Sequence, residues 1–311
     1  MTQSPHTPQD LAQHLAEHSP WSRSGVPQAL GAYLAWGLVP IYFSLLHKVT
    51  PVELVSWRVL FTLPFCLAVV ALRRQGPALR AALGDGRVLR GLALSAALIG
   101  CNWLIYIYAV NSGHVLAASM GYYINPLVSV ALGTLFLGER LRPRQWLAVG
   151  IAASGIALLA WGALDTLGIA LSLAFSFGVY GLVRKLVPVG AVPGLTIETM
   201  VLTPLAVLAA TWFASHGAGS AMLHSGTDPW LLAASGAVTG VPLLLFAIAA
   251  RRMDLSMLGF TQFLSPTIGF VIGVTYFHET LSPVRLACFC TIWLAIAVFC
   301  HDLLKQGAFR R

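Results

Sequence analysis

Charged residues are scarce in this 311-residue sequence. Aspartate, glutamate, lysine and arginine make up 10% of it, against about 25% in a typical soluble domain. Hydrophobic residues make up 57%, and the mean hydropathy is +0.77. A net charge of +8 would suggest a nucleic-acid partner for a soluble protein, but in a membrane protein it is typical of basic cytoplasmic loops. We therefore expect a protein that is embedded in a lipid bilayer and does not bind nucleic acid.

Cysteine is also rare, and its placement argues against metal or disulfide chemistry. All five cysteines lie within apolar runs, and no cysteine or histidine pair has the spacing of a metal site. Small apolar residues packed between helices account for this pattern. We expect no metal ion and no cofactor.

Several motifs of energy coupling and catalysis are absent. The sequence has no GxxxxGK[ST] phosphate loop, which argues against ATP-driven transport, and no HExxH or GxSxG motif. We expect a protein that is not an enzyme. The alternatives to a transporter are an integral membrane enzyme that modifies lipids and a lipid translocator.

One unit of the sequence occurs twice. Pro126 and Glu139 recur as Pro266 and Glu279, each 140 residues later, and the match holds without a gap over about 60 residues. Weak internal symmetry in an apolar chain is typical of secondary transporters.

Ten apolar runs are long enough, at about 20 residues, to cross a bilayer as helices. They are 26–46, 52–72, 89–110, 114–137, 144–161, 164–183, 193–214, 229–250, 256–276 and 284–303. Strands of a membrane barrel would be shorter and would alternate in hydropathy. The predicted fold is therefore an all-α integral membrane protein with ten transmembrane helices.

The basic residues predict the orientation of these helices. If the N-terminus is cytoplasmic, sixteen of the nineteen lysines and arginines fall on the cytoplasmic side, and only Lys48 and Arg285 fall outside. Both termini are then cytoplasmic. Because each repeat has five helices, the two repeats insert upside down relative to each other, which permits alternating access.

These repeats define the predicted domain organisation. It consists of a cytoplasmic tail (1–25), a first repeat (26–161), a second repeat (162–303) and a cytoplasmic tail (304–311).

The fourth and ninth predicted helices each have one face of small and polar residues, at roughly 100° per residue. On the fourth helix this face carries Ser119, Tyr122, Asn125 and Pro126. On the ninth helix it carries Gln262 and Pro266. Small residues also serve close helix packing, but phenol and amide groups add hydrogen-bonding capacity that packing does not need. We predict that the two faces wall a substrate cavity and that the prolines shape the two helices.

Four residues on neighbouring helices are further candidate substrate contacts. The third helix carries Asn102, Trp103 and Tyr106, and the sixth carries Tyr180. Aromatic residues near a helix end also serve as interfacial anchors, and Asn102 has the alternative of bonding to a neighbouring helix.

Arg58 and Glu198 are charged residues within predicted spans, and they occupy matching positions of the two repeats. A charge within a span is usually functional and usually paired. We predict that Arg58 and Glu198 form an ion pair, directly or through substrate, in at least one state. The alternative is that each side chain extends to its own membrane interface. His114 is a candidate for gating or proton coupling, or else a residue at the level of the lipid headgroups.

Several local runs carry a resemblance to a known family. They are GCNWL at 100–104, ASMGYYINPL at 118–127, YGLVRK at 180–185 and IETM at 197–200. These runs resemble the RarD-type permeases of the EamA family, in the drug/metabolite transporter superfamily, and the resemblance covers about residues 25–305. It implies ten helices, two EamA repeats and a location in the bacterial inner membrane. The family name is associated with chloramphenicol sensitivity, and relatives move amino acids and other metabolites outward.

The expected function is therefore secondary transport, with export of small amphipathic metabolites such as amino acids, or of drugs such as chloramphenicol. Energy would come from an ion gradient, with proton coupling as one option, or from the substrate itself. Gln262 stands where the first repeat has Tyr122, so we expect two chemically different cavity walls. The sequence predicts no particular oligomeric state.

Overall fold

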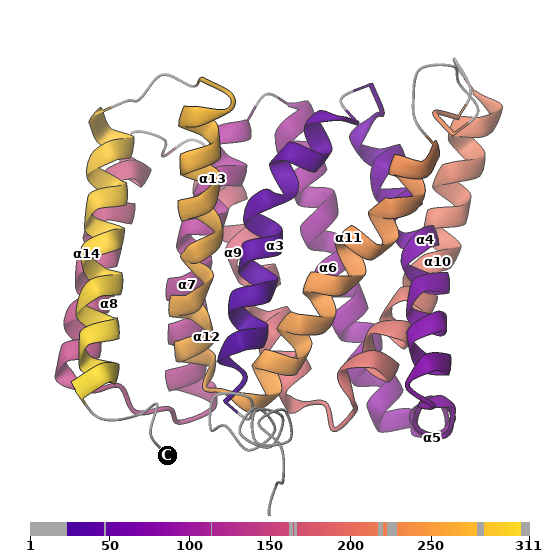
Figure 1. Ribbon diagram of the computed structural model, residues 1–311, viewed down its shortest axis with the longest axis horizontal. Coiled ribbons are helices and arrows are strands. Elements are labelled where there is room, and N and C mark those ends of the chain that lie inside the picture. The colour runs from indigo at the N-terminus through magenta and orange to yellow at the C-terminus, as the bar shows by residue number, and fades with distance from the viewer. Residues whose placement is uncertain are drawn as a thin grey trace, which may run out of the picture.

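The computed structural model describes residues 24–46, 48–112, 114–161, 164, 167–216, 220–222, 229–278 and 283–305. All regular secondary structure within these ranges is helical, so the predicted all-α class is confirmed. The helices are α3 (Val26–Ser44), α4 (Pro51–Leu72), α5 (Gly76–Gly84), α6 (Gly86–Asn111), α7 (Val115–Phe136), α8 (Pro143–Trp161), α9 (Leu167–Leu186), α10 (Ala191–Ser215), α11 (Pro229–Arg252), α12 (Leu255–Gln262), α13 (Leu264–Thr275) and α14 (Pro283–Lys305). The long helices run up and down through one bundle (Figure 1).

Every predicted span has a helical counterpart. Eight segments of the described chain are long and apolar enough to cross a membrane, namely α4, α6, α8, α9, α10, α11, the α12–α13 pair and α14. The predicted spans 26–46 and 114–137 correspond to α3 and α7, helices of 19 and 22 residues. Eight candidate spans thus follow from length and hydropathy, and ten crossings stay a prediction.

Helix α5 was not predicted as a helix. It is only nine residues long, too short to span a membrane. Its Leu79 and Ala82 are buried while Arg80 is exposed, and the helix packs against α4, α6 and α10. An amphipathic pattern over so few residues reaches stability through this packing, because an isolated helix of this length is marginal.

The matched prolines act differently in the two repeats. Helix α7 continues through Pro126 without a break. The corresponding span divides at Phe263 into α12 and α13, three residues before Pro266. Proline removes an N–H and crowds the carbonyl four residues earlier, here that of Gln262, and this accounts for the position of the break.

The outer surface of the bundle is apolar. Leu205, Leu208 and Trp212 on α10 are each at least 60% exposed. Similar side chains project from α8 and α11, including Trp146, Trp161 and Trp230. An apolar surface of this kind is the expected boundary of a helical protein with lipid, and the chain is a multi-pass membrane protein.

One end of the bundle carries a group of basic residues. Helix α9 ends with Arg184 and Lys185, and α11 ends with Arg251 and Arg252. Both helix ends lie at the end of the bundle that carries α5 (Figure 1). We call this end, with its four basic residues and α5, the basic end.

Candidate functional site

A cavity of about 540 Å³ lies within the bundle. Its lining extends from Tyr33 on α3 and Phe177 on α9, both near the middle of their helices, to Phe277 and Arg285. The last two lie beside the α13–α14 connection, at the end opposite the basic end (Figure 1). The polar residues of the lining are Tyr33, Arg58, Asn102, Tyr106, Ser119, Tyr122, Tyr123, Asn125, Thr239, Gln262, Ser265 and Arg285.

Most of the predicted site residues meet around this cavity. Those that line it are Arg58, Asn102, Trp103, Tyr106, Ser119, Tyr122, Asn125, Gln262 and Pro266. The polar faces of the fourth and ninth predicted spans therefore line the same cavity. Helical periodicity alone could not show that these two faces meet. Substrate binding by these residues stays a prediction.

Arg58 is held on the cavity wall by one hydrogen bond and two aromatic rings. Its Nε donates to Thr239 Oγ1 at 2.9 Å. Its guanidinium carbon lies 5.1 Å from the ring centroid of Phe43 and 5.2 Å from that of Trp103, both within cation–π range. These contacts fix the side chain and compensate part of the cost of a charge within a membrane.

Three polar side chains of the middle of the cavity are buried. Asn102 donates through Nδ2 to the Leu173 carbonyl and to Ser176 Oγ, each at 2.9 Å, and so joins α6 to α9. Asn125 is 2% exposed, and its Oδ1 has no hydrogen-bond partner among the described residues. The hydroxyl of Tyr33 is likewise buried without a described partner. Asn102 is thus a helix bridge as well as a lining residue, while Asn125 and Tyr33 retain unused hydrogen-bonding capacity.

Aromatic rings form much of the remaining wall. Tyr106 and Tyr122 lie with ring centroids 6.2 Å apart, and Trp36 meets Phe177 edge-on at 5.7 Å. These rings offer faces and edges to an apolar or aromatic ligand. Trp36 therefore also belongs to the wall.

Below the cavity, toward the basic end, the bundle is closed by packed side chains. Tyr180 is fully buried and stacks on Phe246 with ring centroids 5.8 Å apart and an interplanar angle of 15°. Tyr180 therefore does not line the main cavity, contrary to its predicted place among the substrate contacts, although it lies one helical turn beyond the lining residue Phe177.

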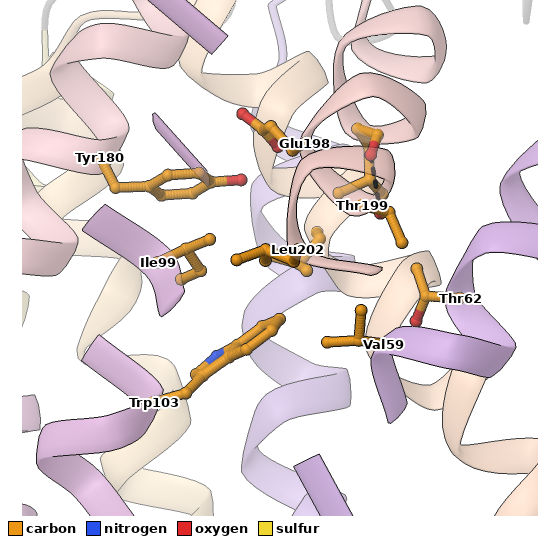
Figure 2. Close-up of a pocket in the computed structure, with 10 residues that line it drawn as sticks. Val59, Thr62, Ile99, Trp103, Tyr180, Glu198, Thr199 and Leu202 are labelled. Carbon is orange, nitrogen blue, oxygen red and sulfur yellow. Dashed lines mark hydrogen bonds between the residues drawn. The ribbon is translucent and has the colours of Figure 1, made fainter. Parts of the chain in front are cut away.

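Glu198 lies in this closed half, on α10. Its carboxylate is 3.4 Å from Arg184 Nη1, with both side chains at most 2% exposed, and it accepts a hydrogen bond from Ser95 Oγ. Its Oε2 has no hydrogen-bond partner among the described residues. The hydroxyl of Tyr180 points toward this carboxylate (Figure 2).

The expected ion pair between Arg58 and Glu198 is not formed in this structure. Glu198 pairs with Arg184, and Arg58 bonds to Thr239. The reason is geometric. Each residue lies seven positions from the start of its helix, but α4 starts at the end opposite the basic end and α10 starts at the basic end. Matching positions of two such helices lie at different depths, so the two charges cannot meet here.

A small cavity lies between Glu198 and the main cavity. Its volume is about 10 Å³, close to the minimum that holds one water molecule. Glu198, Tyr180, Thr62 and Thr199 contribute to its lining (Figure 2). Three further lining residues, Ile99, Trp103 and Leu243, also line the main cavity. The carboxylate is thus separated from the main cavity by only a thin apolar layer.

The repeated glutamate has a structural role that the sequence did not reveal. Glu139 accepts hydrogen bonds from the backbone N–H groups of Leu255, at 2.6 Å, and Ser256, at 2.8 Å, and from Ser256 Oγ at 2.7 Å. It therefore caps the N-terminus of α12, where a negative charge is favourable. A Cβ atom at Gly133 would lie 2.4 Å from Glu139 Oε2, so glycine is needed there to admit the carboxylate. Its repeat partner Glu279 lies outside the described residues.

The remaining predicted residues have local roles. His114 directly precedes α7, and its Nδ1 lies 2.8 Å from Ser112 Oγ; it is not among the described lining residues of the cavity. Pro126 is buried in α7, and its carbonyl faces Gly259. No group of three or more histidine, cysteine or acidic residues that could hold a metal occurs within the described ranges.

Comparisons with known proteins agree with one another. The sequence model of the EamA-like transporter family matches residues 23–161. Protein RarD of Escherichia coli (strain K12) is 44% identical over 289 residues, which are 91% of this chain and 96% of that protein. An uncharacterized transporter of Pseudomonas aeruginosa is 41% identical over 284 residues, covering 91% of this chain and 95% of that one. A crystal structure that is 18% identical shares the fold, with a TM-score of 0.69 over 91% of this chain and 98% of the other.

Proposed function

Because the chain belongs to the EamA family of transporters, as a RarD-type member, we propose that it is a secondary transporter that moves a small metabolite across the bacterial inner membrane by alternating access. The observation that carries this proposal is the cavity itself. It has the size of a small-molecule site, is walled by both repeats, reaches toward one end of the bundle and is closed toward the other. Export is the proposed direction, as the resemblance to this family implies.

An inverted repeat is supported by pairs of matching helix contacts. Gly100 on α6 faces Leu202 on α10, with an ideal Cβ 3.0 Å from Leu202 Cδ2. The positions 140 residues away also meet, since Gly240 on α11 faces Phe65 and Thr62 on α4, with an ideal Cβ 3.5 Å from Thr62 Cγ2. Likewise α3 packs on α13 as α9 packs on α7. Contacts that come in such pairs are expected from a two-fold relation between halves of opposite topology.

Transport would require the basic end to open. In this structure it is held by the Glu139 cap on α12, by Lys185, which donates to the Met253 carbonyl at 2.5 Å, and by the Tyr180–Phe246 stack. These contacts join α9 and the α7–α8 connection to α11 and α12. We propose that they separate as the opposite end closes around the substrate, so that the cavity is exposed alternately to the two sides.

Glu198 is the residue we propose for proton coupling, if the transporter is proton-driven. It is a buried carboxylate with one oxygen lacking a described hydrogen-bond partner, beside a cavity of about one water molecule. The titratable groups around it are Arg184 and Tyr180 on α9 and Cys66 on α4. Substrate uptake into proteoliposomes driven by an imposed pH gradient would test proton coupling. Glu198→Gln should abolish the dependence of uptake on the pH gradient.

The transport proposal is tested by counterflow with purified protein in liposomes, using a panel of amino acids, nucleosides and chloramphenicol. Asn125→Leu and Gln262→Leu should each reduce counterflow at least about tenfold, the effect expected when buried polar contacts to a ligand are lost. Leu127→Ile, on the opposite face of α7, is the control and should change little. Lipid scrambling or lipid modification without counterflow would instead favour one of the two alternative functions.

The proposed orientation has its own test. Ser112, near the end opposite the basic end, and Arg87, at the start of α6 near α5, are both exposed. In cysteine-free protein we expect Ser112→Cys to react with an impermeant maleimide on intact cells and Arg87→Cys to react only after permeabilisation. The reverse pattern would overturn the cytoplasmic placement of the basic end.

A further inference from the structure

The charged side chains of the cavity wall are all positive among the described residues, and this favours one class of ligand. Among the lining residues that the structure describes there are two arginines, Arg58 and Arg285, and no aspartate or glutamate. A ligand with a positive charge would find no carboxylate among these described lining residues, whereas a ligand with a negative charge would find the guanidinium of Arg58. Charge at this depth is costly unless compensated.

Two aromatic rings and one hydroxyl group contact the guanidinium of Arg58. The rings of Phe43 and Trp103 lie 5.1 and 5.2 Å from the guanidinium carbon, and Nε is used by Thr239. The structure gives the two terminal nitrogens no hydrogen-bond acceptor among the described residues. Guanidinium binds carboxylate and phosphate through in-plane N–H groups, often two at once. The contacts that hold Arg58 thus leave available the atoms that an oxyanion uses.

A purely structural role for Arg58 does not explain why this position carries a charge. If the arginine only joined α4 to α11 through Thr239, a neutral hydrogen-bonding side chain would do so without the cost of a charge within the membrane. Nor is it neutralised by its repeat counterpart, because Glu198 pairs with Arg184 in the closed half. The charge is therefore left facing the cavity.

The other lining residues indicate what the remainder of the ligand should be. The rings of Tyr106, Tyr122 and Trp36 offer an apolar and aromatic surface. Asn125 and Tyr33 add buried polar atoms without described partners, which suit one hydroxyl or amide group. A buried polar atom without a partner is destabilising, so a ligand that supplies the partner gains affinity.

We propose that the cavity binds an organic acid with an apolar or aromatic body, its carboxylate on the terminal nitrogens of Arg58 and its body against the aromatic wall. This inference rests on the proposed function, because it names the substrate class of the same cavity. It also departs from the sequence-based expectation of amino acids. A free amino acid would bring an ammonium group into a described wall that has no carboxylate to receive it.

Binding of four compounds with one phenylpropyl body tests the proposal directly. They are 3-phenylpropanoate, 3-phenylpropanamide, 3-phenylpropylamine and phenylalanine, titrated against purified protein by calorimetry or by quenching of tryptophan fluorescence. We expect the carboxylate to bind about tenfold or more tightly than the amide, the gain typical of a hydrogen bond to a charged group. Arg58→Gln should remove this difference, and Arg58→Lys should retain only part of it, because lysine lacks the bidentate fork.

Three controls keep the test decisive. Arg285→Gln should leave the preference for the carboxylate in place, and loss of preference in that variant but not in Arg58→Gln would overturn the assignment to Arg58. If Arg58→Gln does not fold, Arg58→Lys takes its place, and an undiminished preference for the carboxylate in that variant would contradict bidentate binding by Arg58. Equal or tighter binding of the amide or the amine by the unaltered protein would refute the proposed class outright.

The same compounds distinguish this inference from the proposed function. Counterflow of the amine or of phenylalanine but not of the carboxylate would leave a transporter and overturn the substrate class. Tight, Arg58-dependent binding of the carboxylate without counterflow of any compound would support the site and count against transport.

Discussion

The charged residues at one pair of matching repeat positions lie in different environments in the two halves of the bundle. In the half opposite the basic end, Arg58 sits on the wall of a 540 Å³ cavity, held by rings and a single hydroxyl. In the half at the basic end, its repeat counterpart Glu198 is 1% exposed and is paired with Arg184. One backbone framework therefore holds an available charge on one side and a neutralised charge on the other. In a duplicated fold, matching positions can therefore carry charges with different roles. The local packing decides whether the charge faces the cavity or is paired within a helix interface.

The matched prolines show the same divergence in the backbone. Pro126 lies within the continuous helix α7, whereas the span of Pro266 divides at Phe263. Gln262, the last residue of α12, stands at that division and lines the cavity. The second repeat thus places an amide and an interrupted helix where the first repeat has a tyrosine and an intact one.

The largest expected effect concerns the charge pair of the closed half. Glu198→Ala and Arg184→Ala should each cost about 3–5 kcal/mol, because one partner of a buried pair is left uncompensated. The double variant should cost less than the sum of the two. Unfolding in detergent, followed by circular dichroism, measures both effects. For comparison, Lys185→Ala should cost less, because its ammonium lies 4.0 Å from Glu139, its side chain is 22% exposed, and it loses only the hydrogen bond to the Met253 carbonyl. Strictly additive costs would contradict the pairing.

A smaller loss of stability is expected when alanine replaces a glycine in a packed helix interface, and no loss when it replaces a glycine on the cavity wall. A Cβ at Gly236 would lie 2.4 Å from the backbone carbonyl of Phe61, whereas a Cβ at Gly269 would meet no atom within 4 Å. Gly236→Ala should therefore cost about 1–3 kcal/mol through overpacking. Gly269→Ala should be neutral or stabilise the helix by up to about 1 kcal/mol. Similar melting temperatures for the two variants would show that α4 and α11 are less tightly packed than the structure indicates.

The cap of α12 should have an intermediate to small effect. Glu139→Gln keeps one carbonyl oxygen but loses the charge and the second acceptor, and we expect a loss of about 0.5–2 kcal/mol. Ser256→Ala removes only one of the three hydrogen bonds and should cost less. Thermal unfolding gives the order of the two. An unchanged midpoint in Glu139→Gln would mean that the cap does not hold the basic end closed.

The smallest effect is expected at Tyr180. Its hydroxyl has no hydrogen bond among the described residues, while its ring stacks on Phe246. Tyr180→Phe keeps the stack and should change stability by less than about 0.5 kcal/mol. Tyr180→Ala should cost about 3–5 kcal/mol because a large cavity is left. A loss above about 1 kcal/mol in Tyr180→Phe would indicate a hydrogen bond from the hydroxyl to Glu198.

Much of the site was predictable because it depends on one-dimensional patterns. Helical periodicity placed Ser119, Tyr122 and Asn125 on one face, and all three line the cavity. The repeat identified Gln262 as their counterpart on the other wall. The sequence did not show that Tyr180 lies outside the lining of the main cavity, because a tyrosine in the core and one on a wall look the same in sequence. Arg184 was read as a basic residue of a cytoplasmic connection, and nothing in its sequence context distinguishes it from its neighbour Lys185, which is more exposed.

The sequence by itself determined the helical class, the approximate bounds of the helices, the duplication and the group of basic residues at one end. These features depend on hydropathy, repeat spacing and basic residues, all of which act along the chain. Only the tertiary structure decided which charges pair, that Glu139 caps α12, and that Arg58 faces open space while Glu198 is sealed. Those outcomes depend on which helices become neighbours and at what depth two residues meet, and such distances arise only when the helices pack.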